Sequence, residues 1–299
     1  MRDPLPSHEL AAFAAAVETG TVHGAAEALN LTQSAATKRI AALERRLEVR
    51  LLDRSRRGVA PTEVGRLLYP EAKQALAALA TAERVARERA GQWGTLRLAA
   101  SQTIGEFLVP GWLATFRAAG DPGQVQLHIG NSPAVLRELA DGIVDIGFVE
   151  GNDPLDGLGA LTMLSDEIVA VVSVDHPWAR RRSVGVHDLQ QEAFVTREPA
   201  SGTRAVAEAA LALHSVTLEP TAELASTQSL KRAVVSGGFT LLSRLAVQAE
   251  EEARTLAALP VRGVELRREL HAVHVSGAPL PFRARRFWAF LVDQAGANA

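Results

Sequence analysis

The sequence predicts an α/β protein that begins with an all-helical segment, and three observations support this fold class. Apolar residues in the first ninety positions recur at intervals of three and four, which is the spacing of amphipathic helices. From Thr95 onward, short apolar runs alternate with helical segments, as is typical of α/β folds. With 299 residues, the chain is long enough for two domains that each bury a core.

Composition excludes several classes of protein. The absence of cysteine excludes disulfides, thiolate nucleophiles and cysteine-ligated zinc or iron–sulfur sites. Residues 1–6 lack the basic-then-apolar pattern of an export signal. No run of about 18 uncharged apolar residues occurs, so we expect no membrane span. These features predict a cytoplasmic protein.

Charge is distributed unevenly along the chain. The net charge of the whole chain is -2, whereas residues 1–93 carry +3 and the remainder carries -5. Residues 38–57 contain eight basic and three acidic side chains. A local excess of this kind is what a nucleic-acid backbone attracts, and a solvated helix face is the alternative explanation.

Two amphipathic helices open the chain. The first carries an apolar stripe from Leu10 to Val17 and is expected to end near Gly20. Thr21 can cap the second helix, over 22–29, whose apolar side is mostly alanine. Small side chains at such positions allow another helix to cross closely.

A third helix is predicted after a tight turn. Asn30 suits a left-handed turn, and Thr32 can cap the helix that follows. The buried stripe of this helix consists of Ala36, Ile40, Leu43 and Leu47. Two short helices joined by a tight turn predict a helix-turn-helix, with the third helix as the recognition helix.

The exposed side of the third helix carries candidate DNA contacts. Gln33 can hydrogen-bond adenine bidentately, and Ser34 and Thr37 can reach base edges or phosphates. Lys38 is expected to neutralise a phosphate, which adds affinity rather than sequence preference. We include Thr21, at the start of the second helix, among the candidate contacts. The alternative for each residue is a solvent-facing side chain.

Residues 51–62 are expected to form two short strands around a basic turn. Such a wing lies over the DNA backbone or the minor groove, with Arg54, Arg56 and Arg57 as contacts.

Residues 10–65 resemble the winged helix-turn-helix of LysR-type transcriptional regulators. The matching residues are Leu10, Phe13, Val17, Ala25, Ala26, Leu29, Gln33, Ser34, Ala35, Ile40, Leu43, Glu44, Leu47, Leu51, Arg54, Thr62 and Gly65. Three positions depart from the family pattern: Val49 replaces the usual Gly, Leu52 a common Phe, and Thr37 a common Ser. The resemblance implies binding to double-stranded, dyad-symmetric promoter DNA.

A long helix over 62–92 follows the wing, continuing through Pro70 or starting afresh there. Its alanine-rich, near-heptad surface can pack against a second helix or lie along its own domain. The resemblance favours the first alternative, which makes the helix a homodimer interface and implies a homotetramer through further contacts between effector-binding domains.

The second part of the chain is predicted to be an α/β region with mainly parallel strands. Expected strands lie at 95–100, 125–130, 143–149, 168–174 and 193–196, with apolar segments at 239–242 and 265–275. Expected helices lie at 105–119, 133–141, 203–214, 228–236 and 282–294.

This region resembles the effector-binding domain of LysR-type regulators, which has the two-lobed fold of periplasmic solute-binding proteins (type 2). The phrases "SQTIGEFLVP", "LADGIVDIGFVEG" and "REPASGTR" carry the resemblance. It implies a DNA-binding domain over 1–62, a linker helix over 63–93 and an effector-binding domain over 94–299. Lobe I then comprises about 94–163 and 264–299, and lobe II about 164–263.

Loops after strands are the expected ligand sites of such a fold, because helix N-termini offer free N–H groups there. The candidate effector contacts are Ser101, Thr103, Ile104, Asn131, Glu150, Ser201, Thr203 and Thr227. Ordinary helix capping is the alternative for the serines and threonines. Arg204 ranks lower, because it can instead form a salt bridge. We expect a small anionic metabolite, with no other cofactor.

Enzyme chemistry finds no support in the sequence. Nucleophile-elbow, dinucleotide and P-loop motifs are absent, and no catalytic constellation is apparent. His271 and His274 would point to opposite faces of a strand, so no metal site is expected. The sequence therefore predicts an effector-responsive transcriptional regulator. A solute-binding protein or a small-molecule enzyme with the same C-terminal fold is the alternative.

Overall fold

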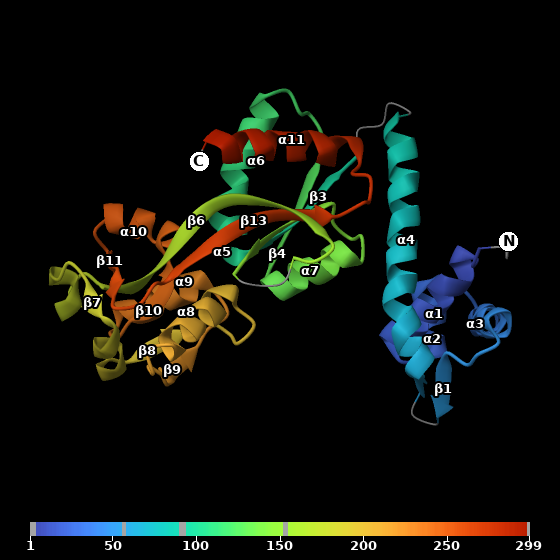
Figure 1. Cartoon of the computed structure of the whole chain (residues 1–299), viewed down its shortest axis with the longest axis horizontal. Helices are drawn as coiled ribbons and strands as arrows, with labels where there is room; N and C mark the ends of the chain where they lie inside the picture. Colours follow the sequence, from blue (N-terminus) through green and yellow to red (C-terminus); the bar gives the residue numbers. More distant parts are fainter. Residues whose placement is uncertain (1–3, 56–57, 90–93, 152–154, 298–299) are drawn as a thin grey trace. The chain divides into compact units, whose positions relative to one another are not determined.

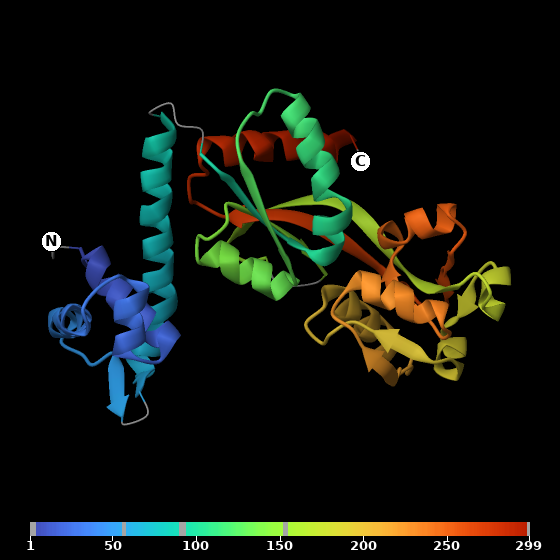
Figure 2. The ribbon, with the colours of Figure 1, turned by 180° about the vertical axis from the view of Figure 1, so that it is seen from behind.

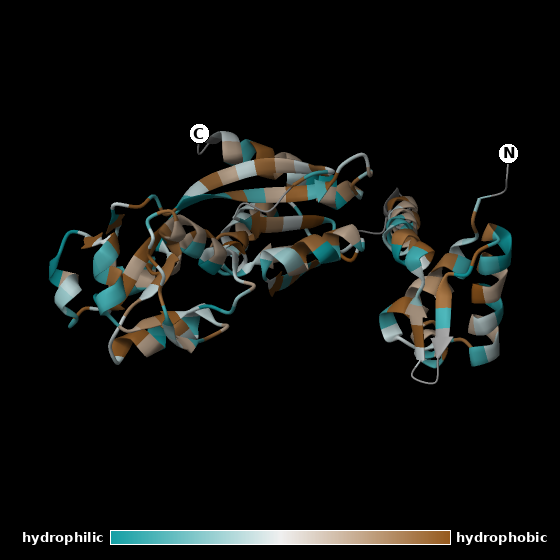
Figure 3. Cartoon of the chain, turned by 60° about the horizontal axis from the view of Figure 1, so that its bottom comes forward, coloured by the Kyte–Doolittle hydropathy of each residue, from teal (hydrophilic) through white to brown (hydrophobic). Residues whose placement is uncertain are grey.

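A computed structural model describes residues 4–55, 58–89, 94–151 and 155–297. The chain divides into two compact units, of which the first comprises residues 1–89 and the short segment 140–143. None of the helices among the described residues qualifies as a membrane-spanning segment. Figure 3 shows hydrophobic and hydrophilic residues alternating along the helices, as expected of elements with one buried face.

The N-terminal unit contains four helices and a hairpin among the residues described. They are α1 (Ser7–Thr19), α2 (Val22–Ala28), α3 (Gln33–Leu47), β1 (Leu52–Ser55), β2 (Gly58–Pro61) and α4 (Glu63–Arg89). The predicted caps are confirmed, since the Thr21 hydroxyl accepts from Gly24 N and the Thr32 hydroxyl accepts from Ala35 N. Asn30 is left-handed with φ 53°, as predicted.

The core of this unit lies between the first three helices. Phe13, Ile40 and Leu43 are fully buried, which confirms the predicted stripes of α1 and α3. Leu47 at the end of the α3 stripe is half-buried and packs against the same core. The apolar side of α3 therefore faces the core, and its opposite face is left to solvent.

The hairpin is attached to α3 through the Glu44 carboxylate. Its Oε1 accepts hydrogen bonds from Leu51 N at 2.8 Å and from Leu52 N at 3.2 Å. The positive φ of the turn before β1 falls on Glu48, at 58°, so Val49 does not need the conformational freedom of glycine. The departure from the family pattern at position 49 therefore leaves this turn intact.

Helix α4 begins against the same hairpin. The Thr62 hydroxyl accepts from Gly65 N at 3.0 Å and donates to the Arg50 carbonyl at 2.8 Å. Gly65 lies so close to the Leu51 carbonyl oxygen that a Cβ at position 65 would overlap it. Pro70 lies within the helix, which continues through it to Arg89.

We expect Gly65→Ala to destabilise the N-terminal unit, because backbone atoms of Leu51 would have to move. Overpacking of this kind costs about 1–3 kcal/mol. Gly111→Ala is the matched control, since a Cβ at position 111 has open space within a helix. That change should stabilise by about 0.4–1 kcal/mol. Calorimetry on the two variants measures both effects, and equal melting profiles would contradict the close approach at Gly65.

The C-terminal unit forms two lobes. Lobe I contains β3 (Leu96–Ser101), α5 (Gln102–Phe107), α6 (Val109–Ala118), β4 (Val125–Gly130), α7 (Ser132–Ala140), β5 (Ile146–Glu150) and α11 (Phe282–Ala297). The predicted helix over 105–119 is instead α5 and α6, which meet at Leu108 because Pro110 cannot continue the hydrogen bonding of a helix interior.

Lobe I places helices on both faces of its sheet (Figures 1 and 2). Leu98 and Ala100 pack with α6 and α11, whereas Ala99 between them packs with α7. This alternation is the period of two expected of a strand buried on both faces.

Lobe II is built in the same way around shorter strands. It contains η1 (Pro177–Arg180), β7 (Val184–Gly185), η2 (Val186–Gln191), β8 (Phe194–Thr196), α8 (Gly202–Ala212), β9 (Pro220–Glu223), α9 (Thr227–Val235), β10 (Thr240–Ser243), η3 (Arg244–Ala246), α10 (Gln248–Glu252), β11 (Leu256–Leu259) and β12 (Val261–Arg262). Ile168 and Ala170 pack toward α8, and Val169 and Val171 pack toward α9.

Two long strands, β6 (Leu158–Ser173) and β13 (Arg267–Val275), connect the lobes (Figure 1). The sheet order is β10-β6-β13-β5-β3-β4, with β11 also paired to β6. The prediction of mainly parallel strands is wrong for this sheet, because every pairing of β6 and β13 is antiparallel. The chain enters lobe II on one of these strands and returns on the other, so the two must run in opposite directions.

Candidate functional site

The N-terminal turns of α3 present a polar surface. Gln33, Ser34 and Lys38 are exposed, and Thr37 is half-buried. The Ser34 and Thr32 hydroxyls lie 3.1 Å apart, so Ser34 also supports the helix cap. Side chains on this face are free to meet a partner because the buried stripe faces the opposite way. The surface has the residue types of a DNA-reading helix.

Of the three arginines predicted as DNA contacts in the wing, Arg54 lies among the described residues. Arg54 lies in β1, opposite Val59 in the hairpin register. Arg56 and Arg57 lie outside the described residues. The hairpin is tied to the turn between α1 and α2, since Val59 N donates to the Gly20 carbonyl at 2.8 Å. Thr21, in that turn, caps α2 and is exposed.

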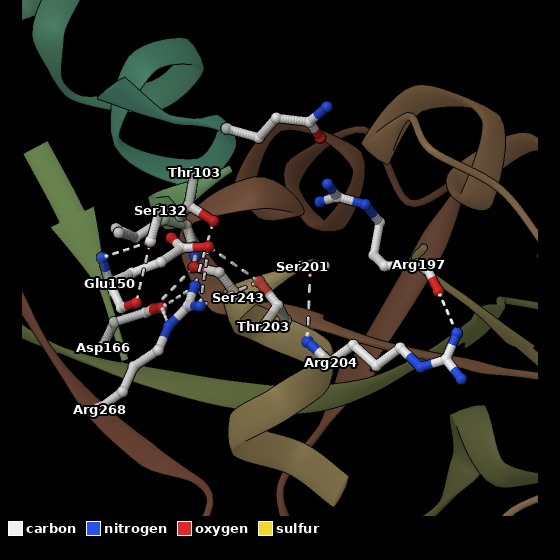
Figure 4. A network of polar contacts seen from close by, with 12 residues as sticks. Thr103, Ser132, Glu150, Asp166, Arg197, Ser201, Thr203, Arg204, Ser243 and Arg268 are labelled. Carbon is white, nitrogen blue, oxygen red and sulfur yellow. Dashed lines mark hydrogen bonds and ion pairs between the residues drawn. The ribbon is translucent and has the colours of Figure 1, made fainter. Parts of the chain in front are cut away.

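In the C-terminal unit, the Arg268 guanidinium joins the two lobes (Figure 4). Its side chain is fully buried, with Nε 2.9 Å and Nη2 2.8 Å from Oδ2 of Asp166. Arg268 and Asp166 are direct partners in the register of β13 and β6. The Ser243 hydroxyl donates to the other oxygen of Asp166 at 2.7 Å.

Three predicted effector contacts converge on the same guanidinium. Arg268 Nη2 donates to the Thr103 hydroxyl of lobe I at 3.1 Å, and Nη1 donates to the Thr203 hydroxyl of lobe II at 2.9 Å. Nη1 also lies 3.1 Å from Oε1 of Glu150. Thr203 in turn donates to that oxygen at 3.3 Å. We call this cluster the hinge network, and its members are Arg268, Asp166, Glu150, Thr103 and Thr203.

The hinge network has a surplus acceptor. One guanidinium faces two carboxylates, which leaves a formal charge of -1 in a buried region. Among the described residues, the buried Glu150 Oε2 and Ser101 Oγ atoms have no hydrogen-bond partner. Buried polar atoms without partners are rare in folded proteins, and each calls for a physical explanation.

The remaining predicted contacts lie in different places. Thr227 donates to the Gln102 side chain across the lobes at 3.3 Å. Ser201 caps α8, as in the capping alternative, and the Asn131 side chain accepts a hydrogen bond from Ala134 N at the start of α7. Ile104 is buried in the core of lobe I.

Arg204 forms ion pairs, which was the alternative to a ligand contact that placed it below the other candidates. Its Nε lies 2.7 Å from Glu208, and its Nη1 lies 2.7 Å from Glu223. Nη1 also donates to the Arg197 carbonyl at 2.8 Å. Burial lowers the pKa of Arg204, but hydrogen bonds to Glu223 and Glu208 raise it, and the net shift of the pKa is upward.

Sequence reasoning missed Arg268 and Asp166, which are the centre of the hinge network. One signal was present in the sequence. Arg268 stands between Leu266 and Leu270, and Asp166 stands between Leu164 and Ile168. Each is therefore a single charged residue on the apolar face of its strand. A lone charge on a buried strand face needs a partner. The partner's identity depends on the register of two strands about a hundred residues apart.

The two histidines of β13 have separate surroundings. His271 Nδ1 lies 3.3 Å from the Thr162 hydroxyl, whereas the His274 ring packs edge-on against Trp288. Burial lowers the pKa of His271, and Glu269 partly opposes this. Among the described residues, no cluster of three metal-ligating side chains occurs.

Comparison with known proteins assigns the two units. Residues 7–66 match the family model described as a bacterial regulatory helix-turn-helix protein, lysR family. Residues 89–296 match the model described as the LysR substrate binding domain. The chain belongs to the LysR family of transcriptional regulators.

LysR-family relatives resemble this chain over nearly its full length. An uncharacterised HTH-type transcriptional regulator of Mycobacterium tuberculosis is 37% identical over 292 residues, covering 92% of each chain. CysL of Bacillus subtilis, an HTH-type transcriptional regulator, is 32% identical over 268 residues, covering 89% of each. Both are described as regulators rather than enzymes, and the alternative of a solute-binding protein or enzyme is not favoured.

Solved LysR-type structures share the fold. A full-length OxyR from Pseudomonas aeruginosa superimposes with a TM-score of 0.71 at 18% identity, covering 100% of this chain and 97% of that one. CbnR, a LysR family transcriptional regulator, superimposes with a TM-score of 0.65 at 18% identity, covering 97% and 99%. The predicted fold class, a winged helix-turn-helix followed by a two-lobed α/β domain, is thereby confirmed.

Proposed function

We propose that this LysR-type regulator reads dyad-symmetric promoter DNA through α3 and the hairpin β1–β2. The observation that carries the proposal is the exposure of Gln33, Ser34 and Lys38 on a helix whose other face is fully packed. A full-length CbnR of the same fold has been solved with its target DNA. Gln33 would read adenine, Ser34 and Thr37 base edges or phosphates, and Lys38 a phosphate. Thr21, Arg54, Arg56 and Arg57 would add backbone contacts.

Helix α4 is the proposed homodimer interface. Its first half covers the core of its own unit through Leu68, Tyr69 and Leu76. Leu67 and Leu79 on the same helix are exposed, with 71% and 49% of their surface accessible. A partner helix would bury these side chains and pair two recognition helices. Further contacts between effector domains would complete a homotetramer, which acts on promoters in the cytoplasm.

The effector is proposed to bind between the lobes, beside the hinge network. The N-terminal turn of α8 offers backbone N–H groups without helical partners, and an anionic group is favoured there. The unpartnered Ser101 hydroxyl and Glu150 oxygen supply further polar contacts. Ile104, Asn131, Ser201 and Thr227 belong to the same proposed set. Because the hinge network spans both lobes, a ligand there would favour one lobe arrangement over another.

The surplus oxygen of Glu150 narrows the effector class. A carboxylate oxygen accepts hydrogen bonds and repels a second anion, so the part of the effector near Glu150 must donate. We therefore propose a small acid that also carries a hydroxyl group or an acidic proton. Two solved effector domains of similar fold hold small molecules, 2-PG in CcmR and shikimate in QuiR.

Footprinting on the gene's own upstream region tests the proposed function. We expect a dyad-containing protected segment whose affinity falls steeply with salt, because phosphate contacts release counterions. Thermal-shift screening against small hydroxylated acids, including 2-PG and shikimate, then identifies effectors by the stability that they add. A protein with no salt-sensitive preference for any dyad fragment would contradict the proposal.

Ser101→Ala should weaken effector binding without loss of stability. The hydroxyl has no partner among the described residues, so its removal breaks no internal hydrogen bond. A lost hydrogen bond to a charged ligand is worth about 1.5–3 kcal/mol, or roughly 10- to 150-fold in affinity. Calorimetric titration with the screened effector measures this.

Ser132→Ala is the control for the effect on stability. The Ser132 hydroxyl, unlike that of Ser101, has a partner within the protein, because it donates to the Glu150 carbonyl at 3.1 Å. We expect this variant to lose stability. Unchanged effector affinity in Ser101→Ala would remove Ser101 from the site.

A further inference from the structure

Lobe II contains a cavity of about 340 Å³, apart from the hinge network. It lies along α8 from Arg204 to Ala212, between that helix, the strands β8 and β10, and the loop after α8. Its walls are mainly apolar and include Phe194, Leu211, Val216 and Leu241. These four side chains are buried members of the lobe II core.

The walls of the cavity are held in place. Val216 N donates to the Leu211 carbonyl at 3.1 Å, which closes the end of α8 over the cavity. Ser215 takes the left-handed conformation, with φ 56°, that such a helix end requires. Ligand pockets in proteins usually span about 300–1,000 Å³, and an apolar cavity of about 150 Å³ already accepts benzene. The volume here suits an aromatic ring with a short chain.

The ion pairs beside the cavity have an acidic surplus. Three charged residues line the cavity, namely Arg197, Arg204 and Glu208. Arg204 shares its single charge between Glu208 and Glu223, and Arg197 Nε lies 2.8 Å from Glu198. When the partners Glu198 and Glu223, which lie outside the lining, are counted, two guanidiniums face three carboxylates, a formal charge of -1. The Glu208 and Glu223 side chains are 56% and 46% exposed, so water and a ligand can reach them.

We propose that this cavity is a second ligand site, which takes a small apolar amine. The apolar body fills the cavity, and the ammonium group lies against the Glu208 carboxylate, which lines it. An ammonium group complements the surplus negative charge, whereas a carboxylate of the same size would meet it as a like charge. Arg204 cannot favour the carboxylate, because two acidic partners already share its charge.

The cavity and the proposed effector contacts share helix α8, and Arg204, next to Thr203 in its first turn, also lines the cavity. Ser201 and Thr203 lie at the first turn of α8, beside the hinge network, and Leu211 and Ala212 lie at its last turn. Ligand binding at the last turn can therefore be measured whether or not an effector binds between the lobes.

Titration of the full chain with 2-phenylethylamine tests the proposal, with 3-phenylpropionate as the carboxylate of similar shape. We expect calorimetry to show binding of the amine at least tenfold tighter than that of the carboxylate. The affinity should fall as salt rises, because the rim charges are partly exposed. No binding of the amine, or tighter binding of the carboxylate, would overturn the proposal.

Matched variants locate the amine. Ala212 lines the cavity and is exposed, so Ala212→Phe should fill its mouth and abolish binding. Ala209→Phe, at an exposed position of the same helix outside the lining, should leave binding unchanged. Glu208→Gln keeps the shape of the rim and should reduce amine affinity several-fold. Circular dichroism melting checks that each variant is folded, and equal affinity in Ala212→Phe and the native protein would disprove the site.

Discussion

Replacing Arg268 with methionine is expected to destabilise the C-terminal unit more than any other substitution considered. The change leaves the Asp166 and Glu150 carboxylates buried without their guanidinium partner. Removing one partner of a buried ion pair costs about 3–5 kcal/mol, because the remaining charge is uncompensated. For a unit of this size, that corresponds to roughly 10 °C in melting temperature. Calorimetry of the full chain measures the shift.

Two further variants separate charge from packing. Arg267→Met, one position away on the same strand, changes an exposed side chain and should melt as the native protein does. Combining Arg268→Met with Asp166→Asn and Glu150→Gln removes the orphaned charges and should recover part of the loss. An Arg268→Met protein as stable as Arg267→Met would show that the hinge network does not stabilise the lobes.

Gln33→Ala is expected to relax sequence preference in DNA binding. A bidentate contact between a glutamine and adenine is worth about 1–3 kcal/mol of discrimination, or roughly 5- to 150-fold. The measurement compares affinities for the footprinted site and for versions with single changed base pairs. Gln33 is exposed, so folding should be unaffected. The native protein should reject one changed site that Gln33→Ala accepts.

Lys38→Ala is the control for this experiment. It should weaken binding to every DNA sequence alike. The slope of log affinity against log salt concentration should fall by the amount that about one phosphate contact contributes. The two residues lie on the same helix and are both exposed. Matching losses in the two variants, on all sequences, would contradict the separate roles proposed for them.

Local elements were predictable from the sequence because they depend on neighbours in the chain. The caps at Thr21 and Thr32, the left-handed Asn30 and strand β4 at 125–130 all appear where the sequence predicts them. The break between α5 and α6 was not predicted, although Pro110 marks it in the sequence. The apolar period continues through that break and hides it.

The candidate site was predictable only in part. Thr103, Glu150 and Thr203 were predicted as ligand contacts, and the structure brings them together around a residue that the sequence did not single out. Their positions after strands were readable from local patterns. Their shared partner was not, because no local pattern connects Arg268 with α5, β5 and α8.

A helical N-terminal part, an α/β remainder and the polar face of α3 were all predictable from the sequence, as were the loops after strands that are proposed to bind the effector. Caps, helical periods and strand alternation are settled within a few residues, so they can be read along the chain. The pairing of Arg268 with Asp166 and the cavity beside α8 in lobe II became visible only in the folded chain. Both depend on strand register and packing between distant segments, which local spacing does not fix.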